Sequence, residues 1–306
     1  MKNSILLQAL IMISVATVSA FAPIRSYSVT RQTTIPTSIF HPSPSTTIFT
    51  RSATFTSTTI RSQSDDNEKD GLFTNLSINP IYAAPYLVFL IVATYMSINE
   101  APGASQSIIE KFIADPLHPN SGSALFEVVF NTLGLIGLPM ACLIMPGAKN
   151  QKFSPTPFLF GSAAAGYGSL GLFMMTRKPV VRVDTEELGF FTKNVLENKI
   201  FNWVLFFALA NTYIITGAGE GLITNAGAIF QDFQQVLSQS ALGLVSTLDL
   251  TILCLTGASL VPEDLERRGV DDKGKAYAIA ASTLLVPAVG LALYSALRPS
   301  LDSDGD

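Results

Sequence analysis

The sequence has few charged residues for its length. Asp, Glu, Lys and Arg make up 14% of its 306 residues, whereas 48% are hydrophobic. A typical soluble domain has about 25% charged residues. Because a water-facing surface needs more charge than this chain offers, the composition favours a membrane protein.

Cysteine and histidine are scarce as well. The two cysteines, Cys142 and Cys254, lie in separate apolar stretches, and neither has a neighbour at metal-ligand spacing, so we expect buried thiols in helix packing. The two histidines are His41 and His118. Two are too few for a histidine-rich metal site, and removal of a leader containing His41 would exclude a bis-histidine haem. We expect neither a metal nor a cofactor.

Motifs of common enzymes are also missing. The sequence has no histidine box, no G-x-S-x-G, no H-E-x-x-H and no glycine-rich phosphate loop after a strand. The glycines at 217, 219 and 221 follow an apolar helix and are interpreted as a flexible break. No Arg lies inside a predicted span, so the Glu–Arg pairs of the light-harvesting family are absent. We therefore predict no enzyme and no catalytic residues, and the lack of a basic patch excludes nucleic acid as a partner.

Acidic residues are absent from positions 1–64, where five basic residues occur. Lys2 precedes the apolar run 5–18, and Val18-Ser19-Ala20 offers a small-residue cleavage site, which predicts a signal peptide over 1–20. Residues 21–64 are rich in Ser and Thr, a composition typical of a disordered plastid transit peptide. A plain secretory signal followed by a linker is the alternative. The mature membrane domain is then 65–306.

The junction of these two segments carries a resemblance. Ser19-Ala20-Phe21-Ala22-Pro23 is similar to the ASAFAP junction of the bipartite plastid presequences of diatom-type algae, with Val18 in the first position. The resemblance implies targeting to a plastid (chloroplast). Together with the apolar segments described next, it predicts a multi-pass protein of a plastid membrane, either thylakoid or inner envelope.

Long apolar segments dominate the rest of the chain. About twenty residues of helix span roughly 30 Å, the thickness of a bilayer's hydrocarbon core. Six segments approach this length: 81–98, 125–145, 157–175, 200–218, 242–261 and 276–297. Residues 222–240 have helical spacing but a polar face, and we interpret them as a surface helix or half-span. The fold class is therefore all-α, a polytopic membrane helical bundle of about six transmembrane helices.

Six spans would divide the basic residues between two sides. Lys69, Lys149, Lys152 and Arg298 fall on one side. The other side holds Lys111, Arg177, Lys178, Arg182, Lys193, Lys199, Arg267, Arg268, Lys273 and Lys275. The excess of Lys and Arg places the second group in the stroma and both mature termini across the membrane.

Polar side chains inside the predicted spans are the candidate site. They are Glu127, Asn131, Asn211 and Asp249. Lipid does not tolerate an ionised carboxylate, so they should face the bundle interior or water. Three interpretations stay open: a polar pathway in which a carboxyl binds a proton or ion, hydrogen bonds between helices, or a holder for a pigment or lipid headgroup in a photosynthetic complex or assembly factor.

The last third of the chain carries a second resemblance. Three features are similar to a two-span ending of uncharacterised polytopic plastid and cyanobacterial membrane proteins. They are an acidic residue in one helix, Asp249, the exit Glu263-Asp264-x-x-Arg267-Arg268, and a final helix that closes on Tyr294 and Arg298. This resemblance implies a plastid membrane setting and no activity. Residues 263–275 are predicted to form a charged loop.

These observations predict a structural, assembly or accessory role at a plastid membrane complex, with the lipid bilayer and other plastid membrane proteins as partners. A secondary transporter of an ion or small solute, using the intramembrane carboxylates, is the alternative.

Overall fold

The computed structural model describes residues 77–115, 119–186 and 188–301, and within these ranges the chain forms helices and no strand. The presequence predicted over 1–64 and His118 lie outside the described residues. The all-α fold class is confirmed for the described part of the chain.

Three helices are long and apolar enough to cross a membrane: α2 (Pro80–Asn99), α4 (Ala124–Ile144, continued by the 3-10 turn η1, Met145–Asn150) and α10 (Ala241–Arg267). A fourth candidate combines α7 (Lys199–Ile215) with α8 (Ala218–Thr224), which is bent from it by 60°. The prediction of six spans is therefore not supported, and the described residues contain three candidate spans, or four with the bent pair.

The predicted span 157–175 is a hairpin of two short helices. Helix α5 (Thr156–Ala165) and helix α6 (Tyr167–Thr176) have ten residues each and pack against one another. The break falls at Gly166, whose φ of 51° and ψ of −131° cannot continue a helix. Ten residues reach about 15 Å, half the thickness of a hydrocarbon core. Hydropathy alone does not distinguish this hairpin from one straight helix, because both are equally apolar.

The predicted span 276–297 is also broken. Helix α11 (Lys273–Ser282) ends before Pro287, and α12 (Val289–Leu297) begins after Ala288, which has a φ of 62°. The sequence led us to expect a kink at Pro287. The structure has two half-length helices instead, because Pro287 and the left-handed Ala288 are adjacent and together stop the helix.

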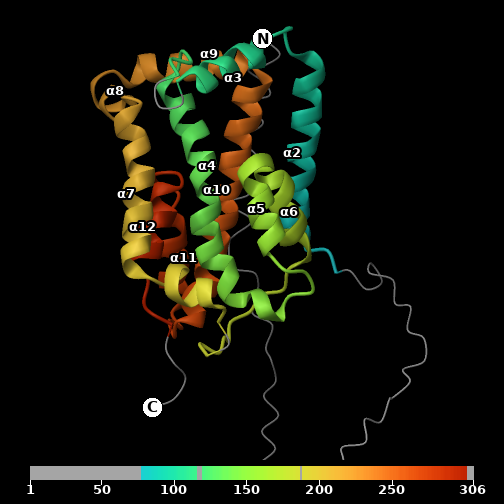
Figure 1. Ribbon diagram of the computed structural model, residues 1–306, viewed down its shortest axis with the longest axis vertical. Coiled ribbons are helices and arrows are strands. Elements are labelled where there is room, and N and C mark those ends of the chain that lie inside the picture. The colour runs from blue at the N-terminus through green and yellow to red at the C-terminus, as the bar shows by residue number, and fades with distance from the viewer. Residues whose placement is uncertain (1–76, 116–118, 187, 302–306) are drawn as a thin grey trace, which may run out of the picture. The chain divides into compact units, whose positions relative to one another are not determined.

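Short helices cover one end of the bundle. Helix α3 (Ala104–Ala114) and helix α9 (Ala226–Gln239) lie across this end, together with α8 (Figure 1). The 222–240 segment is thus mainly α9, whose 14 residues are not among the candidate spans. We call this end, with residues 100–123 and 216–240, the acidic end, and the opposite end the basic end.

The described chain contains the same series of elements twice. A long helix, a helix across the acidic end, a second long helix and two half-length helices occur as α2, α3, α4 and α5–α6, and again as α7, α8–α9, α10 and α11–α12. Asn79 and Asn198 cap α2 and α7, and Ser123 and Ser240 cap α4 and α10. Both α4 and α10 start with Ser-Ala-Leu, at 123–125 and 240–242.

The contacts between helices follow this duplication. Helix α4 contacts α7 and α9 of the second repeat, whereas α10 contacts α2 and α3 of the first. Helix α6 packs on α2, and α12 packs on α7. Equivalent helices run in the same direction, and α4 and α10 lie at the centre (Figure 1). A pseudo-two-fold axis along the bundle, between α4 and α10, relates two parallel repeats.

The two helical hairpins change the distribution of basic residues predicted from six spans. Each hairpin returns to the end from which it starts, so the loops before and after it are neighbours. Gln151, before α5, donates its Nε2 to the carbonyl of Lys178, after α6, at 2.7 Å. Lys149, Lys152 and Arg298 therefore lie at the same end as most of the second group, and the predicted division was wrong.

Candidate functional site

The tip of the α5–α6 hairpin is attached to a buried carboxyl group of α10. Oδ1 of Asp249, on α10, accepts a hydrogen bond from the backbone N–H of Tyr167 at 2.6 Å. Asp249 is 8% exposed. The first N–H groups of a helix have no partner within the helix, and its N-terminus carries partial positive charge. Asp249 therefore caps α6 from another helix, and its Oδ1 satisfies an N–H group that α6 itself cannot bond.

Neighbouring contacts hold the same tip. The hydroxyl of Tyr167 donates to the backbone carbonyl of Tyr82 at 3.1 Å, and that of Tyr86 donates to the carbonyl of Gly168 at 3.3 Å. A Cβ atom on Gly166 would overlap the carboxylate of Asp249. Glycine is thus needed for both its backbone conformation and the close approach of α10. The hairpin tip is fixed to α2 and α10 together.

The other three predicted site residues lie elsewhere. Oε1 of Glu127 accepts from the N–H and hydroxyl of Ser121, at 2.7 and 2.9 Å, in the loop at the acidic end. The Nδ2 of Asn131 is buried and has no hydrogen-bond partner in the described residues. Asn211 is exposed on α7. In the described part of the chain, no hydrogen bond joins any two of these residues or joins them to Asp249.

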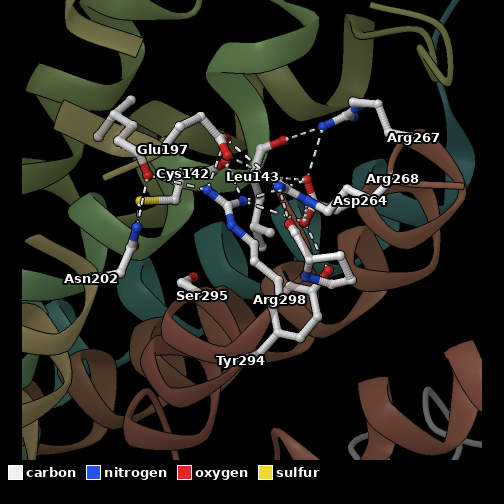
Figure 2. A network of polar contacts seen from close by, with 12 residues as sticks. Cys142, Leu143, Glu197, Asn202, Asp264, Arg267, Arg268, Tyr294, Ser295 and Arg298 are labelled. Carbon is white, nitrogen blue, oxygen red and sulfur yellow. Dashed lines mark hydrogen bonds and ion pairs between the residues drawn. The ribbon is translucent and has the colours of Figure 1, made fainter. Parts of the chain in front are cut away.

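A buried ionic network at the basic end was not anticipated from the sequence. Its centre is Asp264, whose side chain is fully buried (Figure 2). Asp264 accepts from Arg268 Nε at 2.9 Å and from the Tyr294 hydroxyl at 2.7 Å. Arg267 and Arg298 approach it at 3.3 Å each. Four donors around one carboxylate compensate for its loss of water.

Two further carboxylates extend the network. Glu197 accepts from Arg268 at 3.0 Å and from Arg298 at 2.9 Å. Glu263 accepts from both ends of the Arg177 guanidinium, at 3.0 and 2.6 Å. Arg267 joins Glu263 at 2.7 Å.

The guanidinium groups also bind helix ends. Arg298 Nη1 donates to the Cys142 carbonyl at 2.9 Å, and Arg267 Nη1 donates to the Leu143 carbonyl at 3.2 Å. These carbonyls lie in the last turn of α4, where no residue of the same helix can bond them. The network thereby joins the ends of α4, α6, α10 and α12.

Positive charge exceeds negative charge in this cluster, with four arginines against three carboxylates. Burial lowers the pKa of Arg268, but the carboxylates of Asp264 and Glu197 raise it by more, so this pKa lies above its ordinary value. The guanidinium stays charged at any physiological pH.

The prediction of a charged loop over 263–275 was therefore wrong at its start. Helix α10 continues to Arg267, and Asp264 and Arg268 are buried. The i, i+3 and i, i+4 spacing of 263–264 with 267–268 is a helical signal that sequence reasoning could have used. Of the residues named for the second resemblance, all except Asp249 lie in this network.

Cys142 and Cys254 are buried free thiols, as expected.

The polar connection 99–123 is less solvated than its composition suggests. Glu100 accepts a hydrogen bond from the N–H of Ala241 at 2.9 Å and so caps α10. Among the described residues, no cluster of three or more His, Cys, Asp or Glu side chains could hold a metal ion.

Comparisons with known proteins do not assign the chain to a family. No family model matches the sequence, and neither a curated protein nor a solved structure matches the chain.

Proposed function

We propose that this protein is an integral membrane protein of a plastid, without a catalytic centre, that serves a structural, assembly or accessory role at a membrane complex. The apolar candidate spans support membrane insertion. The plastid assignment depends on the presequence composition and its junction motif. A fluorescent protein fused after residue 64 would report the location, and signal outside the plastid would refute that part.

One observation carries the non-catalytic part of the proposal: the buried charges of the bundle bind its own backbone. Asp249 caps α6, and Asp264, Glu197 and Glu263 bind arginines that close helix ends. The two central helices, α4 and α10, also pack closely against one another. A Cβ atom on Gly257 of α10 would lie 3.1 Å from Sδ of Met140 on α4, so the two central helices are in close contact.

The outer faces of the bundle provide surface for lipid and for partner proteins. In the most apolar part of α2, 22% of the residues are buried. Leu87, Ile91 and Ile98 are 58%, 67% and 75% exposed on it. Helix α7, its equivalent in the second repeat, exposes Val204 and Phe207 at 60% and 62%. Such continuous apolar faces need either acyl chains or other membrane helices.

The second oxygen of Asp249 keeps the transporter alternative open. Oδ1 binds Tyr167, but Oδ2 accepts no hydrogen bond from the described residues. A proton or ion could bind there.

The Asp249→Asn variant separates the two functions. We expect this variant to fold and to stay with its complex, because an amide oxygen still accepts from Tyr167. A proton-coupled carrier would instead lose uptake in vesicles. Asp249→Leu is the matched control, which should destabilise the protein because the α6 N–H loses its partner.

Complex formation needs its own measurement. Native electrophoresis of the full chain in mild detergent should show co-migration with other membrane proteins. Migration as a free monomer would contradict an accessory role. Release by an alkaline carbonate wash would contradict membrane insertion.

A further inference from the structure

The two ends of the bundle differ in their content of Lys and Arg. Between residues 79 and 298, twelve Lys and Arg residues lie in or beside the segments at the basic end. Lys111, on α3, is the single basic residue at the acidic end in the described part of the chain. This contrast exists only because both helical hairpins return to the basic end.

Exposed lysines at the basic end stand where apolar helices begin or end. Lys178 follows α6, and Lys273 and Lys275 are in the first turn of α11. All three side chains are exposed. Long cationic side chains at such positions reach the headgroup region while their stems contact apolar surface.

Acidic residues occur at the basic end too. Asp184, Glu186, Glu266, Asp271 and Asp272 are exposed there. These carboxylates reduce the net positive charge of the basic end. They have little influence on the orientation of the protein in the membrane, because topology follows Lys and Arg in short loops and not net charge.

We propose that the basic end lies on the membrane face from which the chain is inserted, against the anionic headgroups of that leaflet. The acidic end, with α3, α8 and α9, is translocated to the opposite face. Residues 79 and 298 both lie on the insertion face, in contrast to the orientation expected from six spans. This inference depends on the proposed membrane insertion.

Labelling with a membrane-impermeant maleimide tests the orientation. Lys178→Cys and Gln231→Cys, an exposed position on α9, would each be placed in the full chain in sealed vesicles whose outer surface is the insertion face. We expect Lys178→Cys to react before permeabilisation and Gln231→Cys only after it. The unsubstituted chain is the background control, since Cys142 and Cys254 are buried.

The reverse pattern, or equal reaction before permeabilisation, would overturn the inference. A carbonate wash of the same vesicles distinguishes this failure from failure of the proposed function. A chain that resists the wash and labels in the reverse pattern is a membrane protein of opposite orientation. A chain that the wash releases refutes insertion itself.

Lipid retention tests the contact with anionic headgroups. The protein would be extracted gently from vesicles of equal phosphatidylglycerol and phosphatidylcholine, and the retained lipids measured. We expect at least about twofold enrichment of phosphatidylglycerol, because each Lys near an anionic surface favours binding. A triple variant, Lys178→Gln, Lys273→Gln and Lys275→Gln, should lose this enrichment, whereas Lys111→Gln should keep it. Equal retention of both lipids by the native chain would overturn the proposed contact.

Discussion

Single residues decide whether the third apolar segment spans or folds back. At Gly166 the backbone is in a region that L-residues rarely adopt, and the carboxylate of Asp249 occupies the space of a side chain. Asp249 in turn satisfies the N–H that the break exposes. The glycine and the carboxylate therefore depend on one another, although they are 83 residues apart in the sequence.

We expect Gly166→Ala to lower the free energy of unfolding by about 1–3 kcal/mol, because the strained backbone and the displaced Asp249 both cost stability. Gly134→Ala in α4 is the control, since its Cβ meets no atom within 4 Å and should be neutral or mildly stabilising. Denaturant unfolding in detergent would measure both. Equal effects of the two variants would contradict the role of Gly166.

Residue differences also show where the two repeats have diverged. Thr132 of α4 is the position equivalent to Asp249, 117 residues earlier, counted from the Ser-Ala-Leu starts. It is 1% exposed, and its hydroxyl has no hydrogen-bond partner in the described residues. One hairpin tip is thus held by a carboxyl group of the other repeat, whereas the equivalent position of the first repeat carries a hydroxyl.

At the scale of elements, half-length helices replace two predicted spans. Small residues of 157–175 pack within the hairpin itself, because Gly161 faces Ser169. In a continuous helix these two residues would be separated by about 12 Å along the axis. In the hairpin, a Cβ on Gly161 would lie 3.1 Å from Cβ of Ser169.

A disulfide tests this geometry directly. The double variant Gly161→Cys and Ser169→Cys should form an intramolecular disulfide under mild oxidation, detected as a mobility shift that a reductant reverses. Each single substitution is a control for reaction with the native thiols. Absence of the cross-link in folded protein would favour a straight span.

At the scale of the whole molecule, the ionic network holds the two repeats together. Arg177 ends the α6 helix of the first repeat, and its partner Glu263 is on α10 of the second. The two side chains are 3% and 11% exposed, so the pair is largely shielded from solvent. Removal of one partner from a buried ion pair strongly destabilises a protein, because the remaining charge is left buried and uncompensated.

A double-mutant cycle with Arg177→Met and Glu263→Gln measures this link. We expect each single change to destabilise the protein by about 3–5 kcal/mol and the coupling free energy to be about 0.5–3 kcal/mol. A second cycle pairs Arg177→Met with Lys111→Gln at the opposite end and should be additive. Additivity in the first cycle would show that the contact contributes no stability.

The sequence was sufficient where local composition decides the outcome. Low charge and long apolar segments indicated the helical class. Helices α2 and α4 appear within one residue of their predicted bounds, whereas α10 continues past its predicted end to Arg267. It was insufficient for the hairpins, because a segment that folds back is as apolar as one that crosses. It also assigned Asp264 and Arg268 to solvent, since a charged residue is usually exposed unless a partner is nearby.

By itself, then, the sequence determined that this chain builds apolar helices, since hydropathy and helical spacing are properties of neighbouring residues. Only the tertiary structure decided which helices stop halfway, that the two repeats share an axis, and that four arginines bury their charge against three carboxylates. Those features depend on contacts between residues far apart in the chain, and no local pattern records which distant group will satisfy a buried charge or an open helix end.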